Sequence, residues 1–165
     1  MFVNKKWSHP NNVAVKHKLR SPAVEILSVG IRPYYLPREF SYVLEKTVYV
    51  LPSANAKEAA SHVHDLDDLA SDAIKIITGN FNHCDLGTTF PTIDKYVTCA
   101  TCKDRTIDLF YCNVQTLYKS LPMSPLGRSY HTAWYTSLHA TGRSCNAKRP
   151  VTKIVCDSSK RQRTC

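Results

Sequence analysis

The sequence has no long hydrophobic run. No apolar stretch approaches the ~18 residues of a membrane-spanning helix, and the opening segment MFVNKKWSHPNN has no apolar core after its lysines. An integral membrane protein and a protein with a cleavable secretion leader are therefore both disfavoured. We expect an intracellular protein that does not contact membranes.

A disulfide framework is also absent. The seven cysteines are scattered and odd in number, which favours thiols in a reducing compartment. Cys99 and Cys102 have the spacing of half a zinc ribbon, but no second CxxC pair follows to complete four ligands. Cys112 and one histidine could supply the other two ligands. Buried or incidental thiols are the favoured interpretation, because cysteine packs as a small hydrophobic residue.

Acidic residues are few: the 165 residues include 13 Asp and Glu against 22 Lys and Arg, which gives a net charge of +9. Such an excess favours a partner that carries phosphate or another anionic surface. The distribution is uneven, because residues 135–165 hold seven cations and one anion, whereas residues 41–94 hold three cations and eight anions. Most of the basic character thus lies in a tail. The charge does not make the whole chain a basic nucleic-acid-binding domain.

What is present suits one domain with a packed core, since 43% of the residues are hydrophobic and 10% are aromatic. Alternating or β-branched stretches recur between Pro, Asn and Gly residues. The predicted strands are residues 13–17, 24–29, 46–51, 73–78, 95–99, 106–111, 115–118 and 132–135. Asn55 is a good helix N-cap with Glu58 three residues later, and apolar residues then recur at helical spacing as far as Ala70. Strand, helix and strand in this order predict an α/β layer.

Polar residues at strand ends are the candidates for chemistry. Tyr49 lies in the third strand, an Asn-rich turn follows Gly79, Asp108 interrupts an apolar strand, and His131 precedes the last strand. Each has a structural interpretation as well. The tyrosine suits a core, the asparagines suit a turn, and the histidine suits a hydrogen-bonded structural role. A carboxylate in a buried strand needs a partner, so Asp108 suits a functional role and a structural ion pair equally.

Six ordered blocks of this sequence resemble the endonuclease/exonuclease/phosphatase superfamily, and in particular the endonuclease domain of LINE-type retrotransposons. The blocks are FVNKKW, EILSVGIRPYYLPREF, TVYVLPSAN, IKIITGNFNHCDL, KDRTIDLFYCN and LPMSPLGRSYH. The resemblance implies a layered α/β sandwich over residues 1–134 and leaves residues 135–165 as a basic tail outside the pattern. It also implies an N-terminally truncated domain with an unpaired sheet edge, because the family's early Asn and metal-binding Glu have no counterpart.

The resemblance assigns roles to individual residues. Tyr49 stands where the family places a tyrosine near the scissile phosphate, and Asn82 stands where it places a polar residue that binds a phosphate oxygen or water. Asp108 matches the carboxylate that orients a histidine, and His131 matches that histidine. The implied reaction is hydrolysis of a DNA phosphodiester assisted by Mg²⁺ or Mn²⁺.

Two positions depart from the family pattern. Asn80 replaces the aspartate that aligns or deprotonates the attacking water, and a carboxamide accepts no proton near neutral pH. Tyr130 replaces an aspartate that helps to hold the metal, and a neutral phenol is a poor ligand for Mg²⁺. The sequence therefore predicts an endonuclease-like domain without catalytic activity. The alternative is a non-catalytic nucleic-acid-binding protein that uses its basic tail, in which residues 148–163 also have the form of a bipartite nuclear-localisation signal.

Overall fold

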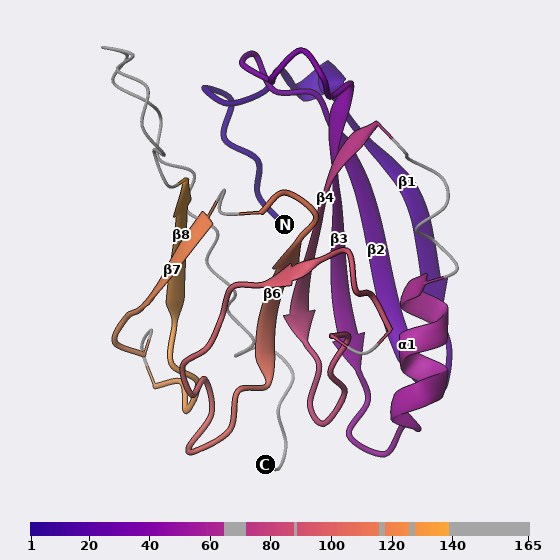
Figure 1. Cartoon of the computed structure of the whole chain (residues 1–165), viewed down its shortest axis with the longest axis vertical. Coiled ribbons are helices and arrows are strands. Elements are labelled where there is room, and N and C mark those ends of the chain that lie inside the picture. The colour runs from indigo at the N-terminus through magenta and orange to yellow at the C-terminus, as the bar shows by residue number, and fades with distance from the viewer. Residues whose placement is uncertain (65–71, 88, 116–117, 126–127, 139–165) are drawn as a thin grey trace.

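The computed structural model describes residues 1–64, 72–87, 89–115, 118–125 and 128–138 (Figure 1). Six strands form one sheet in the order β1-β2-β3-β4-β6-β5, and two further strands form a separate hairpin, β7-β8. The bounds in the large sheet are β1 Val13–Arg20, β2 Val24–Ile31, β3 Tyr42–Val50, β4 Ala73–Asn80, β5 Asp94–Lys95 and β6 Asp108–Cys112. The remaining elements are the 3-10 turn Pro10–Asn12, the helix α1 Ala56–His64, and the strands β7 Tyr118–Pro122 and β8 Trp134–Leu138.

The predicted strand, helix and strand unit is present as β3, α1 and β4. The two strands pair in parallel, as a helical crossover requires, and every other pairing in the sheet is antiparallel. Asn55 is the N-cap, because its Oδ1 accepts the backbone N–H groups of Lys57 at 2.9 Å and Glu58 at 3.4 Å. The predicted continuation of the helix towards Ala70 lies outside the described residues after His64.

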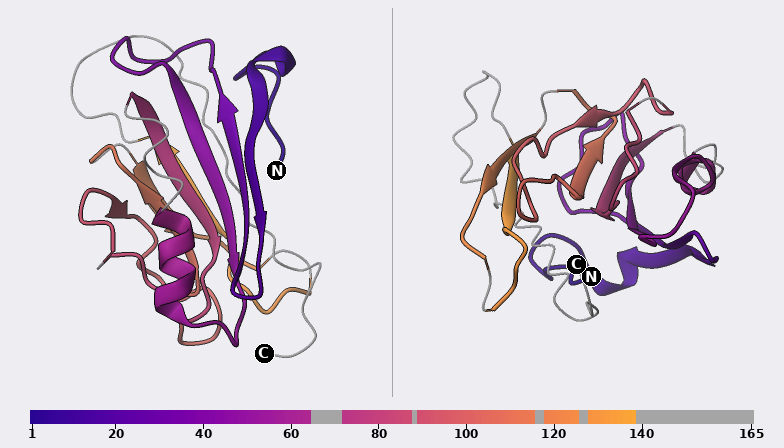
Figure 2. Two further views of the ribbon diagram at one scale, coloured as in Figure 1. Left: turned by 90° about the vertical axis from the view of Figure 1, so that its right-hand side faces the viewer. Right: turned by 90° about the horizontal axis from the view of Figure 1, so that it is seen from below.

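The two faces of the large sheet are covered differently. One face packs against Ala59, Ala60 and Val63 of α1. The other packs against the β7-β8 hairpin, chiefly through Trp134 and Tyr118. Because side chains alternate along a strand, these are opposite faces, and Figure 2 shows α1 and the hairpin on different sides of the sheet. The helix, the sheet and the hairpin are therefore successive layers.

Some strand boundaries differ from the predicted ones. The strand predicted at residues 95–99 is only the two-residue β5, because its pairing with β6 covers Asp94 and Lys95 and is followed by a single further bond, from the Tyr96 N–H to the Phe110 carbonyl at 2.9 Å. The strand predicted from residue 106 begins at Asp108, which pairs with Asn80, whereas the Ile107 carbonyl accepts the N–H of Phe81 beyond the end of β4 at 2.7 Å. Of the strand predicted at residues 115–118, residues 116–117 lie outside the described part of the chain, and Tyr118 is the first residue of β7. The other predicted strands are confirmed to within a few residues of their ends.

The described residues contain no helix long and apolar enough to span a membrane. The four described cysteines, Cys84, Cys99, Cys102 and Cys112, form no disulfide. Among the described residues, no three His, Cys, Asp or Glu side chains come together as a metal site, so the zinc interpretation of Cys99, Cys102 and Cys112 gains no support.

Gly79 makes the sheet sensitive to one small substitution. Its φ is +148°, and a Cβ atom there would lie 1.8 Å from the Val48 carbonyl oxygen of the adjacent strand. We expect Gly79→Ala to lower the free energy of unfolding by about 2–4 kcal/mol, because both strain and backbone overlap arise. Gly30→Ala is the matched control, since its added methyl meets only the flexible Lys16 side chain. Equal urea midpoints for the two variants would contradict this account of β4.

Glu45 should make stability depend on pH. It is 8% exposed within β3, and burial raises its pKa from 4.5 to about 7. Its contribution to stability is therefore fully present below pH 4.5 and is lost as the pH rises through 7. We expect Glu45→Gln to gain roughly 2–3 kcal/mol relative to the unmodified protein between pH 5 and pH 8. Urea denaturation at both pH values measures this difference, with the exposed Glu39→Gln as control. A difference that is constant with pH would contradict the prediction.

Candidate functional site

Three of the predicted site residues meet on one face of the large sheet. Tyr49, near the end of β3, pairs in parallel register with Asn80, the last residue of β4. Asn80 in turn pairs with Asp108, the first residue of β6. Directly paired residues point to the same face with Cβ atoms about 5 Å apart. The polar residues that the sequence scatters over 60 positions thus lie side by side at one end of the sheet.

His131 reaches this end of the sheet from the segment before β8. Its Nδ1 lies 2.7 Å from Oδ2 of Asp108, and the two side chains are buried, with residue exposures of 6% and 4%. The backbone N–H of His131 also donates to Ser129 Oγ at 3.1 Å. The carboxylate therefore has the partner that burial demands. The bond also fixes the orientation of the imidazole, which is the arrangement that a histidine needs to act on a ligand.

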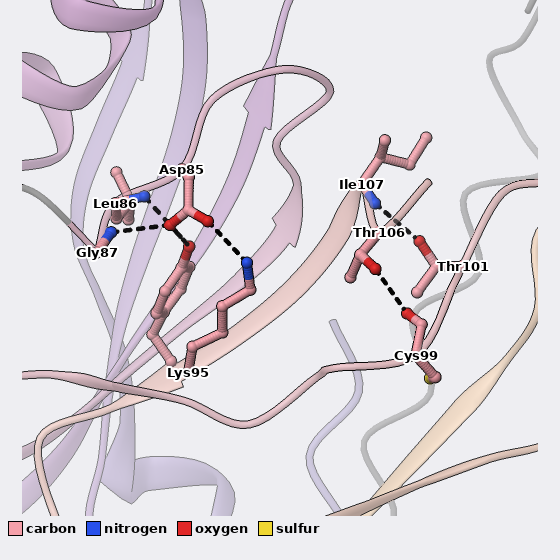
Figure 3. Close-up of polar contacts among 9 residues, drawn as sticks. Asp85, Leu86, Gly87, Lys95, Cys99, Thr101, Thr106 and Ile107 are labelled. Atoms are coloured by element: carbon pink, nitrogen blue, oxygen red, sulfur yellow. Dashed lines mark hydrogen bonds and ion pairs between the residues drawn. The ribbon is translucent and has the colours of Figure 1, made fainter. Parts of the chain in front are cut away.

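Thr101 supports this pair, although no sequence pattern had indicated it. It is fully buried, and its Oγ1 accepts the backbone N–H groups of Ile107 at 3.0 Å and Asp108 at 2.9 Å. Its carbonyl accepts the N–H of Thr132 at 2.7 Å. Figure 3 shows this threonine beside Ile107, with Cys99 and Thr106 bonded close by. Thr101 therefore ties the start of β6, through its side chain, to the segment that carries His131, through its backbone carbonyl.

The asparagines of the G-N-F-N turn are partly committed to the backbone. Asn80 Oδ1 accepts the N–H of Asn82 at 3.0 Å, and Asn82 Nδ2 donates to the Val50 carbonyl at 2.6 Å. Asn82 has a φ of +52°, a conformation that asparagine tolerates better than most residues. The turn is thereby closed against the end of β3. Asn80 Nδ2 is buried and has no hydrogen-bond partner among the residues that the structure describes.

The loop after the turn is held by a second polar cluster, centred on Asp85. Its carboxylate accepts the Tyr111 hydroxyl at 2.9 Å and the Gly87 N–H at 2.8 Å, and forms an ion pair with Lys95 at 2.7 Å (Figure 3). Burial acts to raise the pKa of Asp85, but the hydrogen bonds from Lys95, Gly87 and Tyr111 outweigh it and lower that pKa. The cluster is structural and joins this loop to β5 and β6.

Tyr130 is not part of the pair. It is 85% exposed, whereas His131 next to it is buried. Among the described residues at this end, the predicted positions offer a metal ion the carboxamide of Asn80, the exposed phenol of Tyr130, and the carboxylate of Asp108, which is already bonded to His131. In the part of the chain that the structure describes, no three His, Cys, Asp or Glu side chains gather as a metal site. A hard divalent cation prefers several carboxylate oxygens, so the residues present do not fit the Mg²⁺ or Mn²⁺ that the resemblance implies.

Tyr49 remains available for a ligand. Its side chain is half-buried at the end of β3, and within the described part of the chain its hydroxyl makes no hydrogen bond. A phenol in this setting can donate one hydrogen bond to an oxygen of a bound molecule. The arrangement of Tyr49, Asn80 and the Asp108–His131 pair therefore suits an oxyanion better than a cation.

Comparisons with known proteins add a fold neighbour. No protein-family profile matches the sequence, and no curated protein sequence matches it significantly. The structure is similar to the endonuclease domain of TRAS1, a telomere-specific non-LTR retrotransposon, with a TM-score of 0.54 and 15% sequence identity. The match covers 76% of this chain and 67% of that one. The predicted layered α/β fold is thereby confirmed, because this chain shares the fold of that endonuclease domain. The predicted amino-terminal truncation stays a prediction.

Proposed function

We propose that this chain is a retrotransposon-derived, endonuclease-like domain that binds DNA phosphates and does not cleave them. The observation that carries the proposal is the buried bond of 2.7 Å between Asp108 and His131, with a carboxamide rather than a carboxylate beside it at Asn80. The pair that would contact the phosphate, Asp108 and His131, is thus kept. The aspartates that would activate water and hold a metal are replaced by Asn80 and Tyr130.

Binding would use the hydrogen-bond donors at the end of the sheet. The Tyr49 hydroxyl can donate to a non-bridging oxygen of a phosphodiester, and Asp108 holds the imidazole of His131 in a fixed orientation. Because Asn80 is uncharged and the Asp108 carboxylate is bonded to His131, the site residues described at this end present no free carboxylate that would repel the DNA backbone. A cation between protein and phosphate is therefore not required for binding.

Cleavage lacks a general base. Asn80 cannot take a proton from water, and the Asp108 carboxylate is engaged with His131. Loss of a general base alone costs about 10²–10⁴ in rate. The donor set also does not fit a divalent cation, as described above, so the developing charge on the phosphate has no cation to stabilise it.

The proposal predicts the outcome of a plasmid-nicking assay. With Mg²⁺ or Mn²⁺, we expect the unmodified protein to nick supercoiled DNA no faster than His131→Ala, because both lack an activated water. The double variant Asn80→Asp, Tyr130→Asp restores two carboxylates and should raise nicking above that background. Fluorescence anisotropy should show DNA binding by the unmodified protein that EDTA does not change.

Two results would count against the inactive domain. The first is EDTA-sensitive nicking by the unmodified protein that disappears in His131→Ala. The second is DNA binding that requires the divalent cation, since the donors described above need none. Isothermal titration with Mg²⁺ alone checks the double variant separately, because added carboxylates should strengthen cation binding even if nicking does not return.

The alternative function places nucleic-acid binding in residues 135–165, which are mostly outside the described part of the chain. The charge of this segment favours it, with seven cations against one anion. We expect Lys160→Gln, Arg161→Gln, Arg163→Gln to reduce the slope of log affinity against log salt by up to about 3 for duplex DNA if all three residues contact phosphates. A gel-shift salt titration measures the slope. An unchanged slope would rule out these residues as the binding segment.

A further inference from the structure

The loop between β2 and β3 forms a second polar and aromatic surface, far from the site described above. In Figure 1 this loop lies at the top, with the amino-terminal segment, whereas β3 and β4 end at the bottom, where Asn80 is located. The loop encloses a hollow of about 300 Å³. Its lining residues are Arg32, Pro33, Tyr34, Leu36, Pro37, Arg38 and Phe40.

The exposed groups around this hollow are aromatic rings and guanidinium groups. Tyr34 is 52% exposed and Tyr35 is 86% exposed, although tyrosine rings usually bury most of their apolar surface. Arg32 and Arg38 are exposed as well, and within the described part of the chain neither forms an ion pair. Exposed rings and unpaired guanidinium groups within one loop provide stacking surfaces and charge for an anionic ligand.

The loop is held in shape before any ligand arrives. The Arg32 N–H donates to the Asn12 carbonyl at 3.0 Å, and the Arg32 carbonyl accepts Ser8 Oγ at 2.9 Å. The Tyr34 N–H donates to the Trp7 carbonyl at 3.0 Å. Pro33 and Pro37 further restrict the backbone. Little conformational entropy is therefore lost when a ligand binds to the rings.

We propose that this loop is a binding site for single-stranded nucleic acid. Unpaired bases would stack on Tyr34 and Tyr35, and Arg32 and Arg38 would contact the adjacent phosphates, which is how sequence-tolerant single-strand sites are built. A duplex presents no exposed base faces along its length, so it cannot use the rings in this way. The inference does not depend on the proposed function, because the two sites lie at opposite ends of β3.

Charge around the loop favours a polyanion. Lys5 and Lys6 are exposed in the amino-terminal segment, which the Trp7 carbonyl attaches to the loop. Glu39 is the single acidic residue of the loop. Residues 1–40 carry seven cations and two anions. A site that needs both stacking and positive charge distinguishes nucleic acid from an acidic protein, since polypeptide carboxylates supply charge but no bases.

The test uses the full chain and fluorescence anisotropy with labelled twelve-nucleotide oligo(dT). We expect Tyr34→Ala, Tyr35→Ala to weaken binding at least tenfold, whereas Tyr34→Phe, Tyr35→Phe retains affinity within about twofold because the rings still stack. We expect Arg32→Gln, Arg38→Gln to reduce the slope of log affinity against log salt by about 1.4. Since all four side chains are exposed, urea midpoints should stay unchanged, which confirms that each variant is folded.

Several outcomes would overturn the proposal. Equal oligo(dT) binding by the alanine pair and the unmodified protein would remove the stacking role. An equal loss for a twelve-base-pair duplex would show that the rings do not select single strands. Polyglutamate and unlabelled oligo(dT) are also compared as competitors of the labelled oligo(dT). Equal competition by the two would indicate a site for acidic protein. The comparison is repeated in a His131→Ala background, which removes the contribution of the proposed phosphate site. If Tyr34→Ala, Tyr35→Ala still weakens oligo(dT) binding at least tenfold there, the loop acts independently, so failure of the proposed function and failure of this inference are distinguishable.

Discussion

The arrangement of this molecule depends on the close approach of β4 to β3 near their ends. Gly79 permits it, because any Cβ there would lie 1.8 Å from the Val48 carbonyl oxygen. The next residue, Asn80, is then placed beside Tyr49 on one side and Asp108 on the other. A slip of one residue in β4 would turn Asn80 towards the apolar face that packs on α1 and separate it from Asp108. The register of one strand thus sets both the core and the polar end of the sheet.

The polar end differs from a metal-dependent site in the sign of its charge. A site rich in carboxylates attracts a cation, and the cation then binds the phosphate. Here Asn80 adds no charge, Tyr130 extends into solvent, and Asp108 is bonded to His131. Under the proposed function, the Tyr49 hydroxyl binds a phosphate oxygen directly, without a cation between them. The two departures from the family pattern at Asn80 and Tyr130 would then change which ligand is bound first, while the surrounding fold stays the same.

Local patterns in the sequence were enough to predict the strand, helix and strand unit, because β-branched runs, the Asn55 cap and the apolar helical spacing act over short distances. They were also enough to single out Asp108 and His131. They did not indicate Thr101, because its role arises only when a loop folds back against β6. The predicted strand at residues 95–99 was too long for a similar reason: its pairing with β6 ends after Lys95 and one bond from the Tyr96 N–H to the Phe110 carbonyl. Contacts between distant segments decide such positions.

The two ends of the large sheet are electrostatically independent. β3 has nine residues, and at about 3.3 Å per residue it separates the ends by roughly 30 Å. Screening at physiological salt acts over about 8 Å, so the guanidinium groups of Arg32 and Arg38 exert almost no field at Asp108. The chemistry at each end is therefore set by its own side chains. At the Asp108 end a buried pair restricts how a ligand is oriented, whereas at the loop end exposed rings accept any planar base.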